Sequence, residues 1–154
     1  MSDILIRYAN ENECPLVLDF IKGIAKYEKM SDQVEATVES LYEAIFVKKD
    51  CKVLIAFKLD VPIGFALFFY NFSTFKGRKG LYLEDLFIYP EYRGYSYGKQ
   101  LITHLIHIAK QENCGRMEWV CLDWNQNAID FYVKLEAKPL TEWTIFRLDE
   151  EKFK

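Results

Sequence analysis

A strand–turn–helix pattern over residues 81–110 most constrains how this chain can fold. The apolar and aromatic run Leu81–Tyr89 predicts a buried strand, and Pro90 ends it. An arginine and two glycines lead from there into the helical pattern of residues 100–110, and these are Arg93, Gly94 and Gly98. Such a turn directs backbone N–H groups and the positive end of a helix dipole at one point, which suits a pyrophosphate. A turn that binds no ligand can have the same glycine spacing. Evidence from the rest of the chain is therefore needed to distinguish a phosphate-binding turn from an ordinary one.

Composition indicates one compact domain over residues 1–154. The chain is 51% hydrophobic, with 12 Phe and 10 Tyr, which is enough for a sizeable core. It contains no uncharged apolar run of membrane-spanning length, and no basic region precedes an apolar one at the N-terminus. We therefore expect neither a membrane span nor a signal peptide, no membrane partner, and a cytoplasmic location.

Cysteine and histidine spacing gives no metal motif. The 4 cysteines form no Cys-x-x-Cys pair, so buried free thiols are expected. His104 and His107 lie on the flank of a predicted helix, and no local carboxylate or thiolate completes a ligand set. The sequence predicts no metal.

The net charge of −3 is unevenly distributed, because residues 1–43 carry −5 and the remainder +2. This balance argues against nucleic acid as a partner of the N-terminal half. It favours a small cationic partner, although a solvated acidic helix face has the same composition.

Periodicity along the chain predicts an α/β fold with a mixed sheet and helices on both faces. Helical patterns occupy residues 10–29, 37–46, 100–110 and 128–135. Strand patterns occupy residues 4–8, 53–57, 63–72, 81–89, 116–122 and 143–148.

Five short motifs, in order along the chain, carry a resemblance to a known family. They are Lys26-Tyr27-Glu28, Leu81–Phe87, Tyr92-Arg93-Gly94 with Gly98, Asp123-Trp124-Asn125 and Ile129–Tyr132. The chain resembles the GNAT superfamily of N-acetyltransferases, and within it the spermidine/spermine (diamine) branch. The resemblance implies a central mixed, mostly antiparallel sheet that is splayed at the cofactor site and has helices on both faces.

The resemblance also implies acetyl-CoA as co-substrate, bound where the strand ending near Ile88 splays from the strand over residues 118–122. Main-chain groups of Leu86, Phe87 and Ile88 would meet the pantetheine. Asn125 and Tyr132 would lie on the far side of the cofactor. The pyrophosphate would be bound by the turn described above, whose residues are Arg93, Gly94, Tyr95, Ser96, Tyr97, Gly98 and Lys99.

For the acceptor, the resemblance implies that Tyr27, Glu28 and Glu84 face an amine. An alkylammonium has a pKa of about 10.4, so a base is needed at neutral pH, and Glu84 could take the proton directly or through water. A buried strand carboxylate paired with a cation is the alternative for Glu84. Tyr132 could protonate the departing thiolate, although aromatic residues on a short helix are usually core.

Two positions depart from the family pattern, because Ser96 and Glu136 stand where the family usually has glycine. A left-handed backbone at Ser96 would cost about 1–2 kcal/mol. We expect weaker CoA binding than with glycine, an expectation that fails if Ser96→Gly leaves the CoA dissociation constant unchanged. Glu136 should bear on stability.

Other readings remain open from sequence. The chain could be a non-catalytic acetyl-CoA-binding domain, or the acceptor could be thialysine, a lysine-like amine or a protein amino terminus. The aromatic strands at residues 63–72 and 143–148 offer much apolar surface. With the resemblance, they predict a homodimer built partly on the final strand.

Overall fold

The computed structural model describes residues 3–153. They belong to two compact units, Met1–Trp119 and Val120–Lys154, each of which is described by itself. The single domain expected over residues 1–154 therefore stays a prediction. Among the described residues, no helix has the combined length and apolar character of a membrane span.

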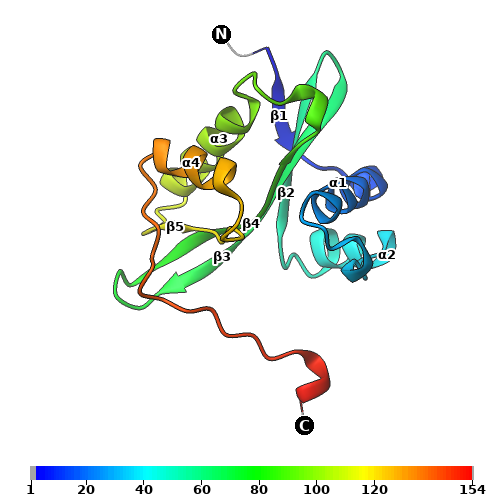
Figure 1. The fold of residues 1–154 in the computed structure, drawn as a ribbon. Coiled ribbons are helices and arrows are strands. Elements are labelled where there is room, and N and C mark those ends of the chain that lie inside the picture. The colour runs from blue at the N-terminus through cyan, green and yellow to red at the C-terminus, as the bar shows by residue number, and fades with distance from the viewer. Residues whose placement is uncertain (1–2, 154) are drawn as a thin grey trace. The chain divides into compact units, whose positions relative to one another are not determined.

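The first unit contains a five-stranded sheet in the order β1-β2-β3-β4-β5 (Figure 1). Its strands are β1 (Leu5–Tyr8), β2 (Lys52–Lys58), β3 (Val61–Ser73), β4 (Arg78–Ile88) and β5 (Met117–Glu118). Strands β1 to β4 pair antiparallel, and β5 joins β4 in parallel. The predicted mixed, mostly antiparallel sheet is confirmed.

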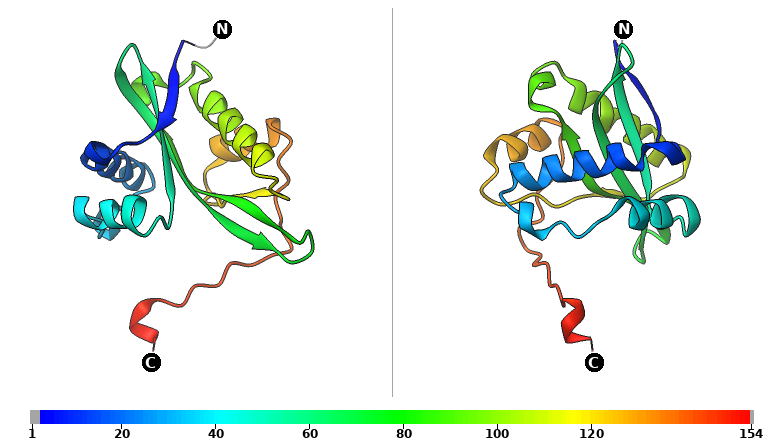
Figure 2. Two further views of the ribbon diagram at one scale, coloured as in Figure 1. Left: turned by 180° about the vertical axis from the view of Figure 1, so that it is seen from behind. Right: turned by 90° about the vertical axis from the view of Figure 1, so that its right-hand side faces the viewer.

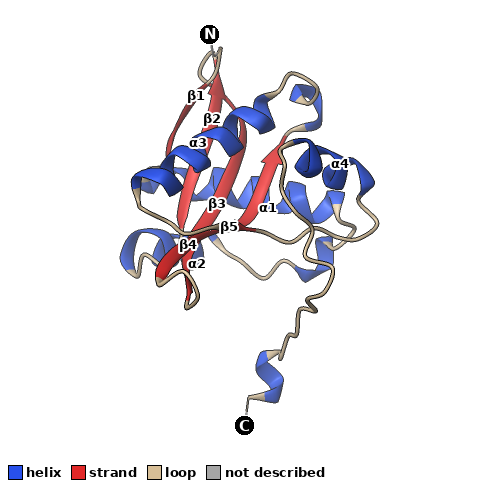
Figure 3. Cartoon of the chain, turned by 90° about the vertical axis from the view of Figure 1, so that its left-hand side faces the viewer, coloured by secondary structure: helices blue, strands red, loops and turns tan. Residues whose placement is uncertain are grey.

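Helices cover both faces of this sheet (Figures 2 and 3). On one face lie α1 (Cys14–Tyr27) and α2 (Val38–Tyr42), which continues as a π-helical turn over Glu43–Val47. On the other face lies α3 (Tyr97–Gln111). Single 3-10 turns occupy Glu11–Glu13, Ser31–Gln33 and Pro90–Tyr92.

Local sequence explains where the first helices begin. Asn10 and Glu13 form a capping box ahead of α1, and Thr37 and Ser40 form one at α2. The apolar faces of α1 and α2 then pack on alternate residues of the sheet, so that Phe20 stacks on Phe65 with ring centroids 5.1 Å apart. This packing fixes the end of α1 over β4.

Strands β3 and β4 approach each other and α1 closely near the start of the turn after β4. A Cβ on Gly64 would lie 2.3 Å from the Phe87 carbonyl oxygen, and one on Gly23 would lie 2.6 Å from the Phe87 ring. Glycine at both positions lets the end of β4 sit tightly between β3 and α1. This close packing holds the turn that follows β4 in place.

The second unit holds α4 (Gln126–Lys134) and a 3-10 turn over Glu150–Lys152. Asn125 caps α4 by accepting a hydrogen bond from the Ala128 N–H at 3.3 Å. Glu136, with φ 67°, ends it in the Schellman pattern, since the Ala137 and Glu136 N–H groups bond the carbonyls of Tyr132 and Val133. Glu136, which stands where the family usually has glycine, thus has a left-handed backbone.

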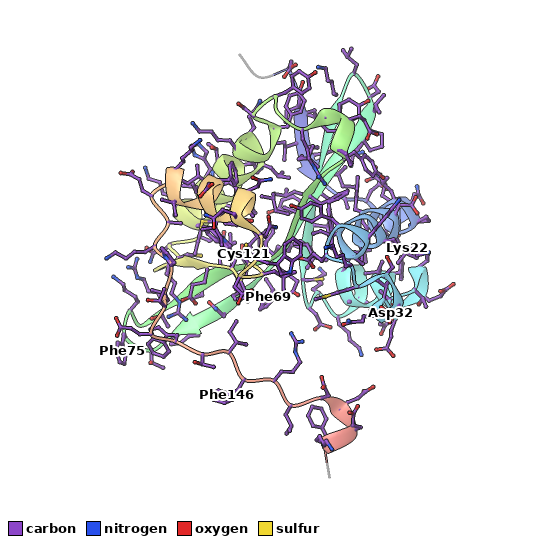
Figure 4. The ribbon with its side chains drawn as sticks, viewed as in Figure 1. Lys22, Asp32, Phe69, Phe75, Cys121 and Phe146 are labelled. Carbon is purple, nitrogen blue, oxygen red and sulfur yellow. The ribbon has the colours of Figure 1, made fainter. Side chains whose placement is uncertain are left out.

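The structure corrects two strand predictions. Residues 143–148 form no strand in the described part of the chain, and their apolar side chains are exposed, as Phe146 in Figure 4 illustrates. The strand predicted over residues 116–122 is reduced to Met117–Glu118. Alternating apolar residues favour an extended backbone, but a strand also needs a hydrogen-bonding partner, which local sequence does not specify.

Candidate active site

The turn between β4 and α3 has the geometry of an anion-binding loop. Gly94 has φ 88° and Ser96 has φ 67°, and α3 begins at the next residue, Tyr97. The first N–H groups of a helix have no partner within the helix, and the helix dipole places positive charge there. The loop from Gly94 to Lys99 therefore has the backbone geometry of an anion site, and pyrophosphate binding there stays a prediction.

Ser96 adopts the left-handed conformation considered for it from the sequence. It is the N-cap residue of α3, yet its side chain makes no capping hydrogen bond. The backbone cost of about 1–2 kcal/mol is therefore present in the ligand-free chain.

Arg93 lies at the base of this loop, with its side chain directed back toward β4. Its Nε donates to the Ile88 carbonyl oxygen at 2.8 Å. Its guanidinium carbon lies 5.1 Å from the centroid of the Tyr27 ring and 5.3 Å from that of Phe87. Arg93 thus ties the loop to the end of β4 and to α1, a positioning role that sequence reasoning did not anticipate.

A groove of about 470 Å³ runs along α3 on the side of β1. Burial and the neighbouring His107 lower the pKa of His104. The groove shares Ser96 and Lys99 with the loop, and its lining residues are Ile4, Ile6, Ser96, Lys99, Gln100, Thr103, His104 and His107.

The main chain of β4 is open beside the loop. Its pairing with β5 covers only Leu81 and Tyr82 among residues 3–119, whereas Leu86, Phe87 and Ile88 pair with β3. Every second residue of such an edge directs its N–H and C=O away from the paired strand. This edge of Leu86–Ile88 is consistent with main-chain groups that face a ligand, and their contact with pantetheine stays a prediction.

Strand β4 contains a β-bulge at the residues that matter most for chemistry. Leu67 pairs with Asp85 and Phe68 with Leu83, so Glu84 is the additional residue. Leu67 packs in the core beneath α1 and α2, and directly opposite residues share a face. Asp85 therefore faces the α1 side of the sheet. Simple alternation could not have predicted this, because the bulge shifts the pattern by one residue.

Three carboxylates interact electrostatically near this bulge, where Glu84 is exposed and Asp85 is half-buried. Glu28 is the C-cap residue of α1. Burial raises the pKa of Glu28, and the negative charge of Glu84 raises it further. Burial, Glu84 and then Glu28 raise the pKa of Asp85 to about 7. The predicted Glu28 and Glu84 thus interact electrostatically, and Asp85, which sequence reasoning missed, interacts with both. Their role toward an amine stays a prediction. The signal available was an adjacent acidic pair inside an apolar strand.

Aromatic and thiol groups border the three carboxylates. The Tyr82 ring packs at a tilt of 31° against that of Phe69, labelled in Figure 4, with ring centroids 5.1 Å apart. Burial, with Glu84 contributing, raises the pKa of both Tyr82 and Cys51. Tyr27 lies at the end of α1 beside Glu28. Carboxylates flanked by aromatic rings form an environment suited to an alkylammonium group.

The remaining predicted site residues lie in the second unit. Asn125 is the N-cap of α4, and Tyr132 lies on α4 with its ring 5.4 Å from that of Phe131. Tyr132 is half-buried. Across residues 3–153, no group of three or more His, Cys, Asp or Glu residues could hold a metal ion.

Comparison with known proteins identifies the family. The family model "Acetyltransferase (GNAT) family" matches residues 18–136. The chain belongs to the GNAT family. It is therefore a GNAT-type acetyltransferase, and its mixed sheet and the helices on both faces agree with the fold that the resemblance implied.

Two relatives and one solved structure show the GNAT similarity in more detail. The thialysine N-epsilon-acetyltransferase of Bos taurus is 36% identical, over 98% of this chain and 95% of its own length. The spermidine/spermine N(1)-acetyltransferase-like protein 1 of Homo sapiens is 29% identical, over 95% of this chain and 22% of its own length. An integron cassette protein from the mobile metagenome of V. cholerae is 28% identical with a TM-score of 0.79, covering 97% of this chain and 94% of its own.

Replacing Ser96 with glycine should stabilise the fold of this GNAT protein. Glycine removes the left-handed cost of about 1–2 kcal/mol but loses more entropy on folding, so we expect a net gain of about 1 kcal/mol. Denaturant unfolding measures this gain, and CoA titration of the same variant tests the expected tighter binding. Ser96→Ala is the control, because it removes the hydroxyl and keeps the strain. A gain shared by both variants would contradict the backbone argument.

Proposed function

We propose that the protein transfers an acetyl group from acetyl-CoA to a primary amine of a small cationic acceptor, directly within a ternary complex. The observation that carries this proposal is the cluster of Glu28, Glu84 and Asp85 at the bulge of β4. Glu84 and Asp85 lie on the strand whose end leads into the loop Gly94–Lys99, and Glu28 lies at the end of α1. An acidic, aromatic-flanked site attracts ammonium groups, which are the protonated form of the nucleophile.

The nucleophile requires a base. With a pKa of about 10.4, an alkylammonium must lose a proton before its nitrogen can attack the thioester carbonyl. Glu84 is the proposed acceptor of that proton, directly or through water. The C–N bond then forms and leaves the nitrogen cationic. The C–S bond breaks as the tetrahedral intermediate collapses, the nitrogen loses its second proton to solvent, and the Tyr132 phenolate regains a proton from solvent after it has protonated the thiolate. A backbone N–H of β4 near Leu86 is proposed to stabilise the oxyanion of this intermediate.

The departing thiolate requires a proton. Tyr132 is the proposed donor, because a phenol with an ordinary pKa of about 10 keeps its proton at neutral pH and can pass it to a thiolate whose conjugate acid has a pKa of about 8.5. The loop from Gly94 to Lys99 is proposed to bind the pyrophosphate of acetyl-CoA, and Asn125 is proposed to lie on the side of the cofactor that Tyr132 occupies.

We propose that the acceptor is a small molecule with two amino groups. Two or more carboxylates favour a molecule with a second cationic group in addition to the reacting amine. The relatives named for thialysine and for spermidine/spermine support this class. Polyamines and thialysine or lysine-like amines are therefore the acceptors to test first, and a protein amino terminus is the remaining alternative.

Thiol release from acetyl-CoA tests the proposal. Spermidine, spermine, thialysine and lysine serve as acceptors, and each product is checked by mass spectrometry for one added acetyl group. We expect release that depends on at least one of these amines and that saturates with it. Amine-independent release, or CoA binding without acetylation of any acceptor, would contradict the proposed function.

We further propose a homodimer and a cytoplasmic location. The exposed apolar side chains of residues 143–148 support a second copy as their partner, since Trp143 is 78% and Phe146 91% exposed. All four cysteines are free, which fits a reducing compartment. A monomeric mass by light scattering at micromolar concentration would contradict the dimer.

A further inference from the structure

The hairpin between β2 and β3 reaches the phosphate-binding loop through one lysine. Lys58 is the last residue of β2 and pairs with Val61 across a turn whose two residues, Leu59 and Asp60, both have positive φ. Lys58 is therefore on the last rung of the hairpin, where its backbone is held by the sheet.

The Lys58 ammonium begins a chain of hydrogen bonds into the loop. Its Nζ donates to the Tyr97 hydroxyl at 2.6 Å, and that hydroxyl donates to Asp3 Oδ2 at 3.0 Å. Lys58 Nζ also lies 3.4 Å from Asp3 Oδ2. The hydrogen bond with Tyr97 raises the pKa of Lys58 and lowers that of Asp3, so both groups are charged. The network joins three segments that are far apart in the sequence.

The same ammonium lies against both tyrosines of the loop. Lys58 Nζ is 5.3 Å from the ring centroid of Tyr97 and 5.8 Å from that of Tyr95, and the two rings stack with centroids 5.8 Å apart. Tyr97 is buried and Tyr95 is exposed. Lys58 thus contacts the residue on each side of Ser96.

Ser96 explains why the loop needs such contacts. Its left-handed backbone is unfavourable for a residue with a Cβ, and its side chain makes no capping bond that would hold the conformation from within. A strained conformation persists only where surrounding structure enforces it. Contacts from outside the loop must therefore keep its N–H groups aligned.

We propose that Lys58 is a positioning residue for the co-substrate: through Tyr97 and Tyr95 it holds the loop around Ser96 in the conformation that binds the pyrophosphate. This rests on the proposed use of acetyl-CoA. Lys58 acts through the loop, and its effect is expected on affinity for CoA rather than on the acceptor or on the chemical step.

Two measurements on Lys58→Met test this role. Methionine keeps an apolar side chain of similar length and removes the ammonium. We expect the dissociation constant for CoA to rise about tenfold, with the acceptor KM unchanged. In the ligand-free variant, amides of residues 94–98 should exchange hydrogen faster, while those of α1 should not. Lys52→Met is the matched control, because Lys52 lies on the same strand and its Nζ is 5.8 Å from the Tyr8 ring.

The outcomes separate the two proposals. If wild-type protein does not bind CoA, the proposed function fails, and loop exchange still reports whether Lys58 holds the loop. If wild type binds CoA but Lys58→Met leaves either the loop exchange or the CoA dissociation constant unchanged, the positioning role is overturned. Equal effects of Lys58→Met and Lys52→Met would also overturn it.

Discussion

Tyr132→Phe is expected to lower turnover about 100-fold or more while leaving the CoA dissociation constant unchanged. The substitution removes only the phenolic hydroxyl, so the ring contact with Phe131 can persist. Without this acid the thiolate must leave unprotonated or take its proton from water.

Tyr42→Phe is the matched control for this result, because Tyr42 is an exposed tyrosine of α2 that has no proposed role in the reaction. Steady-state kinetics and CoA titration of both variants measure the effect. Unchanged turnover in Tyr132→Phe would move the acid to another group or to water. A parallel loss of CoA binding would instead make Tyr132 a binding residue.

Asp85→Asn is expected to make the fold more stable than wild type at pH 7 and above, by roughly 2–4 kcal/mol. Burial and the charges of Glu84 and Glu28 raise the pKa of Asp85 to about 7, from an ordinary value of 3.8. Between these two pH values the folded protein retains a proton that the unfolded chain has lost. Wild-type stability therefore falls as pH rises from about 4 to about 7, and the variant lacks this loss.

Chemical denaturation at pH 4 to 8 measures the difference between wild type and Asp85→Asn. The two proteins should have similar free energies of unfolding near pH 4 and diverge up to about pH 7. The contribution of Glu13, whose pKa its hydrogen bond with Arg7 lowers, is common to both proteins and cancels in this difference. Asp32→Asn, at an exposed carboxylate labelled in Figure 4, controls for the loss of one charge. A difference that does not vary with pH would contradict the burial of Asp85 in the acidic cluster.

Sequence alone predicted the parts of this protein that depend on local chemistry. Some residues determine the conformation of the backbone next to them. They are the apolar run Leu81–Tyr89, Pro90, which ends the strand, and the glycines Gly94 and Gly98. Strand, turn and helix therefore form where predicted. The question of a left-handed backbone at Ser96 was also evident, because Ser96 stands where the family usually has glycine.

Features that depend on distant contacts could not be predicted in the same way. The bulge that turns Asp85 toward α1 arises from the register between β3 and β4, which alternation along one strand does not report. Lys58 reaches Tyr97 across 39 positions of sequence. The strand predicted at residues 143–148 was wrong for the same reason, since its apolar pattern specifies no partner.

The most direct test of the account compares a dicationic and a monocationic acceptor in Glu28→Gln. The central claim is that the acidic cluster selects an acceptor through a second positive charge, and Glu28 lies at the end of α1 beside Glu84. We predict that kcat/KM for spermidine falls about tenfold or more, whereas that for a simple primary monoamine changes less than about twofold. Equal losses for both acceptors, or no loss for spermidine, would contradict the claim.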